Sequence, residues 1–278
     1  MPMGHRVRSL AVAFACCSAS CGGGAPLLHP AHVLPFGRMS AGAGMSGQFA
    51  FRNAERSNAA PPEQRAFEDA IARATLSPGI APWAGARAGL GERFEAGLAY
   101  TGRSVRADAR RAFGGDSVAV SVGAAASAVF SETNDGSDGP SPSMTSGRLS
   151  PTVADVRANG YGFDVPVLVG WRSAASVVEG WLGARGGVEH VGGDLPLAPG
   201  GEEPPGKASF GATRWYGGGL VGAALGLSPI TVAVELDVAY QSVTGTASFP
   251  AEAGPPGRRD GSASGLTLSP AGAIIGKF

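Results

Sequence analysis

The chain has little charge, no cysteine after residue 21 and no long apolar run. Charged residues make up 16% of its 278 residues, and Lys+Arg and Asp+Glu both total 22. This is well below the usual quarter, and the balance of signs gives no general reason to expect nucleic-acid binding. The three cysteines are Cys16, Cys17 and Cys21. Disulfides, thiolate catalysis and cysteine-ligated metals are therefore excluded from the body of the chain. Without an apolar run of spanning length, only strands could cross a membrane.

The clearest structural signal is a strict alternation over residues 230–241, ITVAVELDVAYQ. Every second residue from Ile230 to Tyr240 is large and apolar, and Glu235 and Asp237 lie among the residues of the other face. A period of two over this length predicts a strand. The strand could belong to the half-buried sheet of a soluble protein, or it could cross a membrane with lipid on one side and a polar lumen on the other.

Similar alternation recurs along most of the chain and predicts an all-β fold. High glycine and proline contents, 45 and 21 residues, fit many short strands joined by turns. We expect a transmembrane antiparallel up-and-down barrel of about ten strands, with eight or twelve still possible, over residues 37–278. The expected strands are residues 37–51, 83–90, 94–100, 105–113, 117–131, 160–172, 177–191, 213–226, 230–241 and 265–278.

The lengths of the expected connections favour the membrane interpretation. Outer-membrane barrels have short turns at one end and longer loops at the other. Four of the five connections expected at one end are long, namely residues 52–78, 132–159, 192–212 and 243–264, and all four at the other end are short. Residues 63–76 within the first loop could form a short helix. A soluble sandwich has no reason to sort its loops in this way.

Aromatic residues on the apolar faces cluster at the expected strand ends, whereas the strand centres use Val, Leu, Ala and Gly. Such girdles mark the two interfaces of a membrane barrel. The expected girdle consists of Phe94, Tyr100, Phe113, Phe130, Tyr161, Trp171, Trp215, Tyr240 and Phe278.

Residues 1–21 have the features of an export signal. His5, Arg6 and Arg8 give a basic start, a short apolar stretch follows, and small residues precede Cys21. This resembles a bacterial lipoprotein signal, which implies lipidation at Cys21, although Ser18 stands where that family prefers an aliphatic residue. A plain cleaved signal is the alternative. Residues 22–36 are expected to form a flexible mature N-terminus.

Two further stretches resemble known outer-membrane proteins. A final strand that ends in phenylalanine, here Phe278, resembles the assembly signal of bacterial outer-membrane barrels. The stretch over residues 81–113, together with RWYGGGLVGAALG and VAVELDVAYQSVTG, resembles predicted outer-membrane barrel proteins and lipoproteins of myxobacteria. The resemblance covers most of residues 35–278. It implies an outer-membrane location, with outer-membrane lipid, lipopolysaccharide and the barrel-assembly machinery as partners, and it implies no activity.

Charged residues on the inward faces are the main functional candidates. In a barrel of about ten strands the lumen is narrow, so these charges are expected to pair across it. The alternative is a narrow polar pore whose selectivity they set. The expected lumen charges are Arg87, Glu95, Arg106, Asp108, Arg110, Asp164, Arg172, Glu179, Arg185, Glu189, Glu235 and Asp237.

The sequence therefore predicts a non-enzymatic membrane barrel, either a narrow channel or a structural protein, with no cofactor, metal or catalytic residue. The alternative function is a surface binding module that acts through the long outer loops. His190 at the outer end of its strand could belong to a rim protease, but the paired acidic and Asp-x-His patterns of omptin-type proteases are missing.

Overall fold

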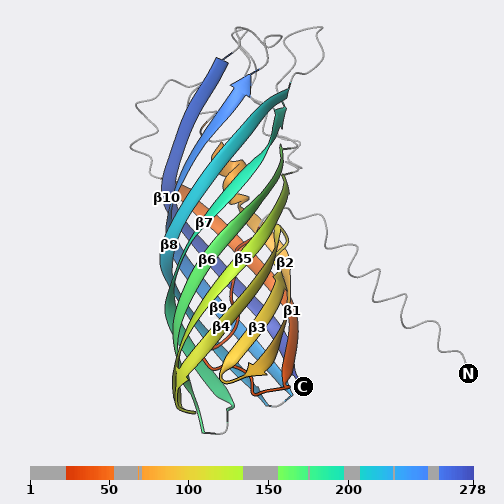
Figure 1. The fold of residues 1–278 in the computed structure, drawn as a ribbon, viewed down its shortest axis with the longest axis vertical. Coiled ribbons are helices and arrows are strands. Elements are labelled where there is room, and N and C mark those ends of the chain that lie inside the picture. The colour runs from red at the N-terminus through yellow and green to blue at the C-terminus, as the bar shows by residue number, and fades with distance from the viewer. Residues whose placement is uncertain are drawn as a thin grey trace, which may run out of the picture.

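Ten strands, each antiparallel to its neighbours, close into one barrel in the order β1-β10-β9-β8-β7-β6-β5-β4-β3-β2 (Figure 1). The fold is thus the ten-stranded antiparallel barrel that the alternation predicts. The strands are β1 Met39–Arg52, β2 Gly79–Gly91, β3 Phe94–Tyr100, β4 Ser104–Gly114, β5 Val118–Thr133, β6 Val156–Arg172, β7 Val178–Pro196, β8 Lys207–Leu227, β9 Ile230–Phe249 and β10 Gly257–Lys277.

This computed structural model describes residues 23–52, 68, 71–133, 156–174, 176–196, 207–227, 229–249 and 257–278. The expected export signal, with Cys21, lies outside the described residues, as do the central parts of the expected loops 52–78, 132–159, 192–212 and 243–264.

The connections are sorted by length between the two ends of the barrel. At the short-turn end, β2–β3, β4–β5, β6–β7 and β8–β9 are joined by two to five residues. At the long-loop end, only β3–β4 has a short connection, residues 101–103. The rim at the long-loop end is uneven, because β3 and β4 have 7 and 11 residues whereas β8 and β10 have 21 each.

The first and last strands meet in a seam with one gap. Phe278 closes the short-turn end of the seam, since its N–H donates to the carbonyl of Met39 and the N–H of Met39 donates back, at 2.8 and 3.1 Å. Register places Gly47 opposite Pro270, but the pairing skips from Ser46 to Phe49. Because proline has no N–H, the ladder is interrupted at this point.

Two of the expected loops were predicted too long. β7 and β8 extend into the expected loop 192–212, and β9 and β10 extend into the expected loop 243–264. These extensions invert the apolar-out pattern of the rest of the barrel: Val243 and Ala247 face inward and are buried, while Thr244 and Ser248 face outward. In Figure 1 the upper ends of β7 to β10 stand above the rest of the rim.

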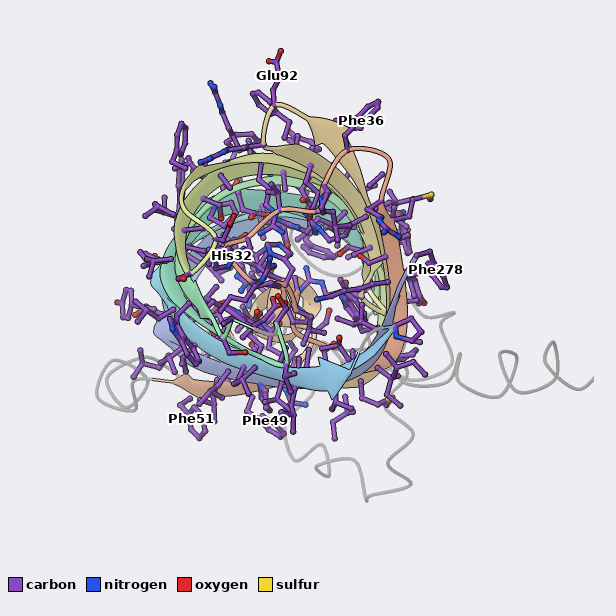
Figure 2. The ribbon with its side chains drawn as sticks, turned by 90° about the horizontal axis from the view of Figure 1, so that it is seen from below. His32, Phe36, Phe49, Phe51, Glu92 and Phe278 are labelled. Atoms are coloured by element: carbon purple, nitrogen blue, oxygen red, sulfur yellow. The ribbon has the colours of Figure 1, made fainter. Side chains whose placement is uncertain are left out.

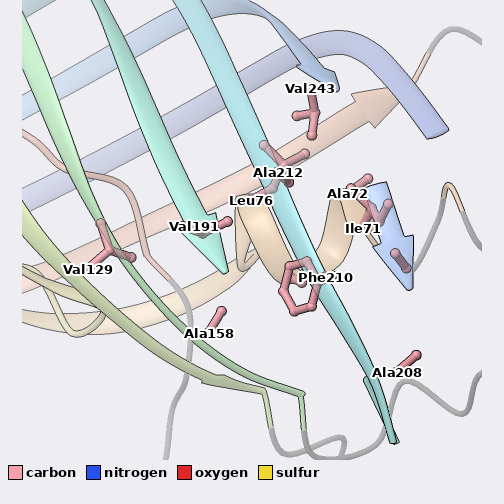
Figure 3. Close-up of a cluster of buried hydrophobic side chains, with 12 residues drawn as sticks. Ile71, Ala72, Leu76, Val129, Ala158, Val191, Ala208, Phe210, Ala212 and Val243 are labelled. Carbon is pink, nitrogen blue, oxygen red and sulfur yellow. The ribbon is translucent and has the colours of Figure 1, made fainter. Parts of the chain in front are cut away.

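The side chains inside the barrel form two apolar clusters, one toward each end. The cluster at the long-loop end surrounds residues 71–76, which are helical and lie inside the barrel wall (Figure 3). Of the expected helix over residues 63–76, the structure describes Glu68 and residues 71–76, and all of these are helical. Ile71 and Ala74 on its predicted apolar face are buried, and Phe67 lies outside the described residues.

No helix in the described part of the chain has the length and hydropathy required to cross a bilayer.

Candidate functional site

The outward face of the barrel is apolar over a broad band. All nine aromatic residues of the expected girdle point outward, with exposed fractions from 38% for Tyr100 to 69% for Tyr161. Phe49 and Phe51, which the expected girdle does not include, also point away from the wall (Figure 2). The outward guanidinium of Arg111 lies 5.1 Å from the ring of Phe94 and 5.3 Å from that of Phe113. Aromatic side chains thus hold this cation at the short-turn end.

All twelve residues expected as lumen charges point into the barrel. Seven of them form one continuous ion-pair network from β2 to β7. Asp108 lies between Arg87 and Arg106, and Asp164 lies between Arg106 and Arg185, at 2.9 and 3.0 Å. Glu95 pairs with both Arg87 and Arg110. Each buried charge in this network therefore has an opposite charge beside it, as a narrow lumen requires.

Two smaller groups of ion pairs lie at the two ends of the lumen. Toward the short-turn end, Glu179 lies 3.3 Å from Arg172 and 3.0 Å from Lys277. Toward the long-loop end, Glu189 pairs with Arg103 and lies 4.0 Å from Arg214. Sequence reasoning missed Arg103, which stands in an expected turn where alternation assigns no face. It also missed Arg214 and Lys277, although alternation beside the outward Trp215 and Phe278 places both of them inward.

The segment of residues 23–36 runs through the lumen and is not the flexible terminus expected from the sequence. Figure 2 shows it running from Phe36 at the outer rim into the ring of strands, where His32 lies. Leu27, Leu28, His29, Ala31 and His32 are all buried. Leu27, Leu28 and Ala31 pack against lumen side chains that include Trp83, Trp181, Leu168 and Leu220. We call residues 23–36 the lumen segment.

Wall side chains hold the lumen segment mainly by its main chain. Glu235 accepts the N–H groups of Leu27 and Leu28 on its two oxygens, at 2.7 and 3.0 Å. The N–H of Leu34 donates to Glu95 at 2.7 Å.

The carbonyl groups of the lumen segment are held by arginines of the wall. Arg110 donates to the carbonyl oxygens of Pro30 and His32, and Arg185 donates to that of Ala25. These hydrogen bonds involve charged groups, which makes them stronger than neutral ones.

At its other end the lumen segment completes the strand seam. The N–H of Gly24 donates to the carbonyl of Gly47 at 3.2 Å. Gly47 is the residue that register places opposite Pro270 across the seam. A Cβ on Gly24 would lie 2.8 Å from this carbonyl oxygen and from Cβ of Ser269. Only glycine therefore fits at this position.

The long-loop end of the lumen is closed by residues 71–76. Ile71, Ala72, Ala74 and Leu76 pack on inward residues of β5 to β9, among them Val191, Phe210 and Val243 (Figure 3). Arg103 donates to the carbonyl oxygens of Thr75 and Leu76 at 3.0 and 3.1 Å, so it caps the C-terminal end of the helix. We call residues 71–76 the helical seal.

Two cavities within the lumen are small. One of about 60 Å³ lies between the lumen segment and the wall near His32, Trp83 and Arg172. Another of about 50 Å³ lies between Ala25 of the lumen segment and the wall, beside Asp237 and Tyr216. Each has room for a few water molecules. Buried polar atoms at His32, Trp83 and Glu179 have no protein partner, so the first cavity is suited to ordered water.

His190 lies on the outward face. Its Nδ1 is 3.0 Å from Oγ1 of Thr213, and its ring lies 5.7 Å from that of Tyr161. Within the described ranges, no group of three His, Cys, Asp or Glu residues is placed to hold a metal ion.

Comparison with solved structures finds bacterial outer-membrane barrels. Neisserial surface protein A is 11% identical, with 87% of this chain and 99% of that chain covered and a TM-score of 0.32. A major outer membrane protein from Thermus thermophilus is 11% identical, with 86% and 99% covered and a TM-score of 0.34. The outer membrane protease OmpT from Escherichia coli is 8% identical, with 89% and 100% covered and a TM-score of 0.32.

No protein-family model and no curated protein sequence matches the chain. The resemblance to myxobacterial proteins is not tested by these structures and stays a prediction. Similarity as weak as this indicates nothing about function, which has to be inferred from the residues of the chain itself.

Proposed function

We propose that the protein is an integral bacterial outer-membrane barrel without enzymatic activity, closed by its own lumen segment. The apolar outward band with aromatic side chains at both ends supports a lipid environment, because an exposed apolar surface of this extent is not stable in water. Antiparallel closure leaves no open sheet edge in the hydrocarbon.

The single observation that favours a structural protein over a narrow channel is the filled lumen. The lumen segment and the helical seal lie in series along the barrel axis, and each is held by buried contacts. Ions would have to displace both. A channel function therefore requires both the lumen segment and the helical seal to leave.

Full-length protein refolded in detergent and inserted into planar bilayers tests this proposal. We expect the unboiled protein to migrate differently from the boiled protein in gel electrophoresis, because a closed barrel resists detergent in the cold. We expect no steady current at low voltage. A steady current through the unmodified protein would contradict the closed state, and the absence of a boiling-dependent shift would contradict the membrane barrel.

A second candidate function is surface binding at the long-loop end, supported by an open groove of about 650 Å³ on the extensions. Hydroxyl groups dominate its rim, which suits a hydroxylated polymer such as the sugars of lipopolysaccharide. The polar side chains around the groove are Glu68, His190, Thr213, Thr244, Thr246, Asp260 and Ser262.

Thr244→Arg should weaken binding of purified lipopolysaccharide at least tenfold, because the long side chain would fill the groove. Ser248→Arg adds the same charge to the outward face of the same strand, beyond the groove, and is the matched control. Equal binding by the two variants would contradict the groove as the binding site.

Lipidation at Cys21 remains a further proposal. Its test is metabolic labelling with radioactive palmitate: Cys21→Ser should abolish the label, whereas Cys16→Ser and Cys17→Ser should retain it. A label that survives Cys21→Ser would contradict the assignment.

A further inference from the structure

We infer that the lumen wall is a binding site for an extended, uncharged peptide, and that the lumen segment occupies this site as a tethered ligand. This inference goes beyond the proposed function, because it concerns what the wall recognises and holds whether or not the barrel ever conducts.

The contacts are directed at the main chain. Three N–H groups of the segment donate to wall carboxylates, three of its carbonyls accept from wall guanidinium groups, and Gly24 bonds the wall through both its N–H and its carbonyl. The carbonyl of Gly24 accepts from Ser46 at 3.1 Å. Recognition of this kind depends on backbone geometry and only secondarily on side chains.

The partners of Glu235 favour a peptide-binding site over an ordinary ion-paired interior. The carboxylates of the ion-pair network and of the two smaller groups each pair with arginine or lysine. Glu235 is 4% exposed, and its hydrogen bonds come from the N–H groups of Leu27 and Leu28 and the indole N–H of Trp181, at 3.0 Å. Without the segment this buried carboxylate would lose two of three donors, at a high energetic cost.

The backbone of the lumen segment is bent so that two successive N–H groups point at one carboxylate. Leu28 has a φ of 52°, a left-handed conformation that is uncommon for a residue with a side chain. Successive N–H groups around such a residue converge on one anion. Leu27 and Leu28 accordingly contact the two oxygens of Glu235.

The composition of the segment defines the ligand class. GGAPLLHPAHVLPF contains no Lys, Arg, Asp or Glu, and its three prolines favour extended backbone. Leu27 and Leu28 fill the apolar part of the site against Trp83 and Trp181. We therefore expect the wall to take proline-containing peptides with two adjacent leucines and no charged side chain.

The exposed turn that follows the buried part of the lumen segment permits a test in the full-length protein. Residues 35–39 are exposed at the short-turn end, and Gly37 has open space around its Cα. A protease recognition sequence inserted between Gly37 and Arg38 allows the chain to fold intact and then be cut. After the cut, only non-covalent contacts hold the lumen segment.

The experiment measures retention of the segment and its exchange with a fluorescent synthetic peptide of residues 23–36, by anisotropy in detergent. We expect the segment to co-purify with the cut barrel and the synthetic peptide to replace it slowly. Methylation of the peptide nitrogens of Leu27 and Leu28 should weaken binding by about tenfold or more, because both hydrogen bonds to a charged acceptor are lost. Methylation at Phe36, which is 79% exposed, is the matched control and should change nothing.

Two outcomes would overturn the inference. One is loss of the segment on cutting, with no binding of the synthetic peptide. The other is equal binding of the peptides methylated at Leu27 and Leu28 and at Phe36, which would show that side chains alone are recognised. Glu235→Gln in the wall should reproduce the effect of methylation. Because the readout is binding in detergent, failure here leaves the location and closed state of the barrel untouched.

Discussion

At the scale of single residues, small side chains on the lumen face make room for large ones across the ladder. Trp181 on β7 pairs with Gly222 on β8, and a Cβ on Gly222 would lie 2.1 Å from the indole ring. Gly187 stands in the same relation to Tyr216, and Gly97 to Arg87. The glycines thus decide where the buried aromatic and guanidinium groups lie.

Gly222→Ala should destabilise the barrel by about 1–3 kcal/mol, the usual range for overpacking. The indole must move, and its hydrogen bond to Glu235 is then lost. Urea unfolding followed by tryptophan fluorescence measures the change. Gly217→Ala on the outward face of the same strand has open space and is the matched control. Equal stability of the two variants would show that the indole has room to move.

The two histidines of the lumen segment should make its docking depend on pH. Burial, together with Arg110, Arg87 and Arg106, lowers the pKa of His29 well below its ordinary value of 6.5. Burial and Arg172 lower the pKa of His32, with Glu179 opposing them. The docked state therefore binds fewer protons than the free segment.

Docking should be strongest above about pH 6.5 and weaken as the pH falls, by up to about tenfold per unit for each histidine. Exchange of the cut segment at pH 5 and pH 7.5 measures this slope. His29→Leu should flatten it, whereas His190→Gln on the outward face should leave it unchanged. Docking that strengthens at low pH would contradict the assignment.

At the scale of elements, the barrel has two closures of different chemistry. The lumen segment is held by hydrogen bonds to charged groups, and the helical seal is held by apolar packing and the cap from Arg103. Since they lie in series, removal of one leaves the other in place.

Ile71→Asn and Glu235→Gln should each leave planar-bilayer conductance near that of the unmodified protein, and the double variant should conduct. Ile71 is 1% exposed, so the polar side chain displaces the helical seal. The control is a double variant in which Arg73→Asn, on the exposed face of the same helix, is combined with Glu235→Gln in place of Ile71→Asn. This control should not conduct. Conductance from Ile71→Asn alone would show that the lumen segment does not block the lumen.

Much of the wall could be predicted from the sequence, because apolar-out alternation is strong wherever outward residues such as Val232 and Val234 alternate with polar ones. The extensions of β7 to β10 could not be predicted. Val243 and Ala247 reverse the alternation, because in this part of β9 the apolar side chains face inward and the polar ones outward. The docking of the lumen segment could not be predicted from its side chains, because Glu235 and Arg110 bind its main chain. Its glycines and prolines are, moreover, typical of loops.

At the scale of the whole molecule, the two termini of the barrel domain meet at one seam. Phe278 contributes its backbone to closure with Met39, while its side chain, 67% exposed, faces outward. The backbone contacts serve stability, and the exposed ring is available to the barrel-assembly machinery that we propose as a partner.

Phe278→Ala should lower the amount of barrel in the outer membrane severalfold without changing urea stability after refolding in detergent. Boiling-dependent mobility of the membrane fraction measures assembly. Ile274→Ala removes a similar outward apolar side chain from the same strand and should assemble normally. Equal loss of assembly in both variants would mean that apolar area, not the terminal ring, is what the cell requires.

The hydrogen bond from Gly24 to Gly47 beside Pro270 also has a consequence for the order of events in biogenesis. The seam lacks one donor of its own, and the segment that supplies the replacement lies within the cylinder. A cylinder that closed first could take up that segment only slowly, end-on and past Arg110 of β4 and Arg185 of β7. We therefore expect the strands to wrap around a segment already in place, so that β1 and β10 join last. The barrel wall would then close around the lumen segment as its template. A nascent chain without residues 23–36 should form the β1–β10 seam slowly.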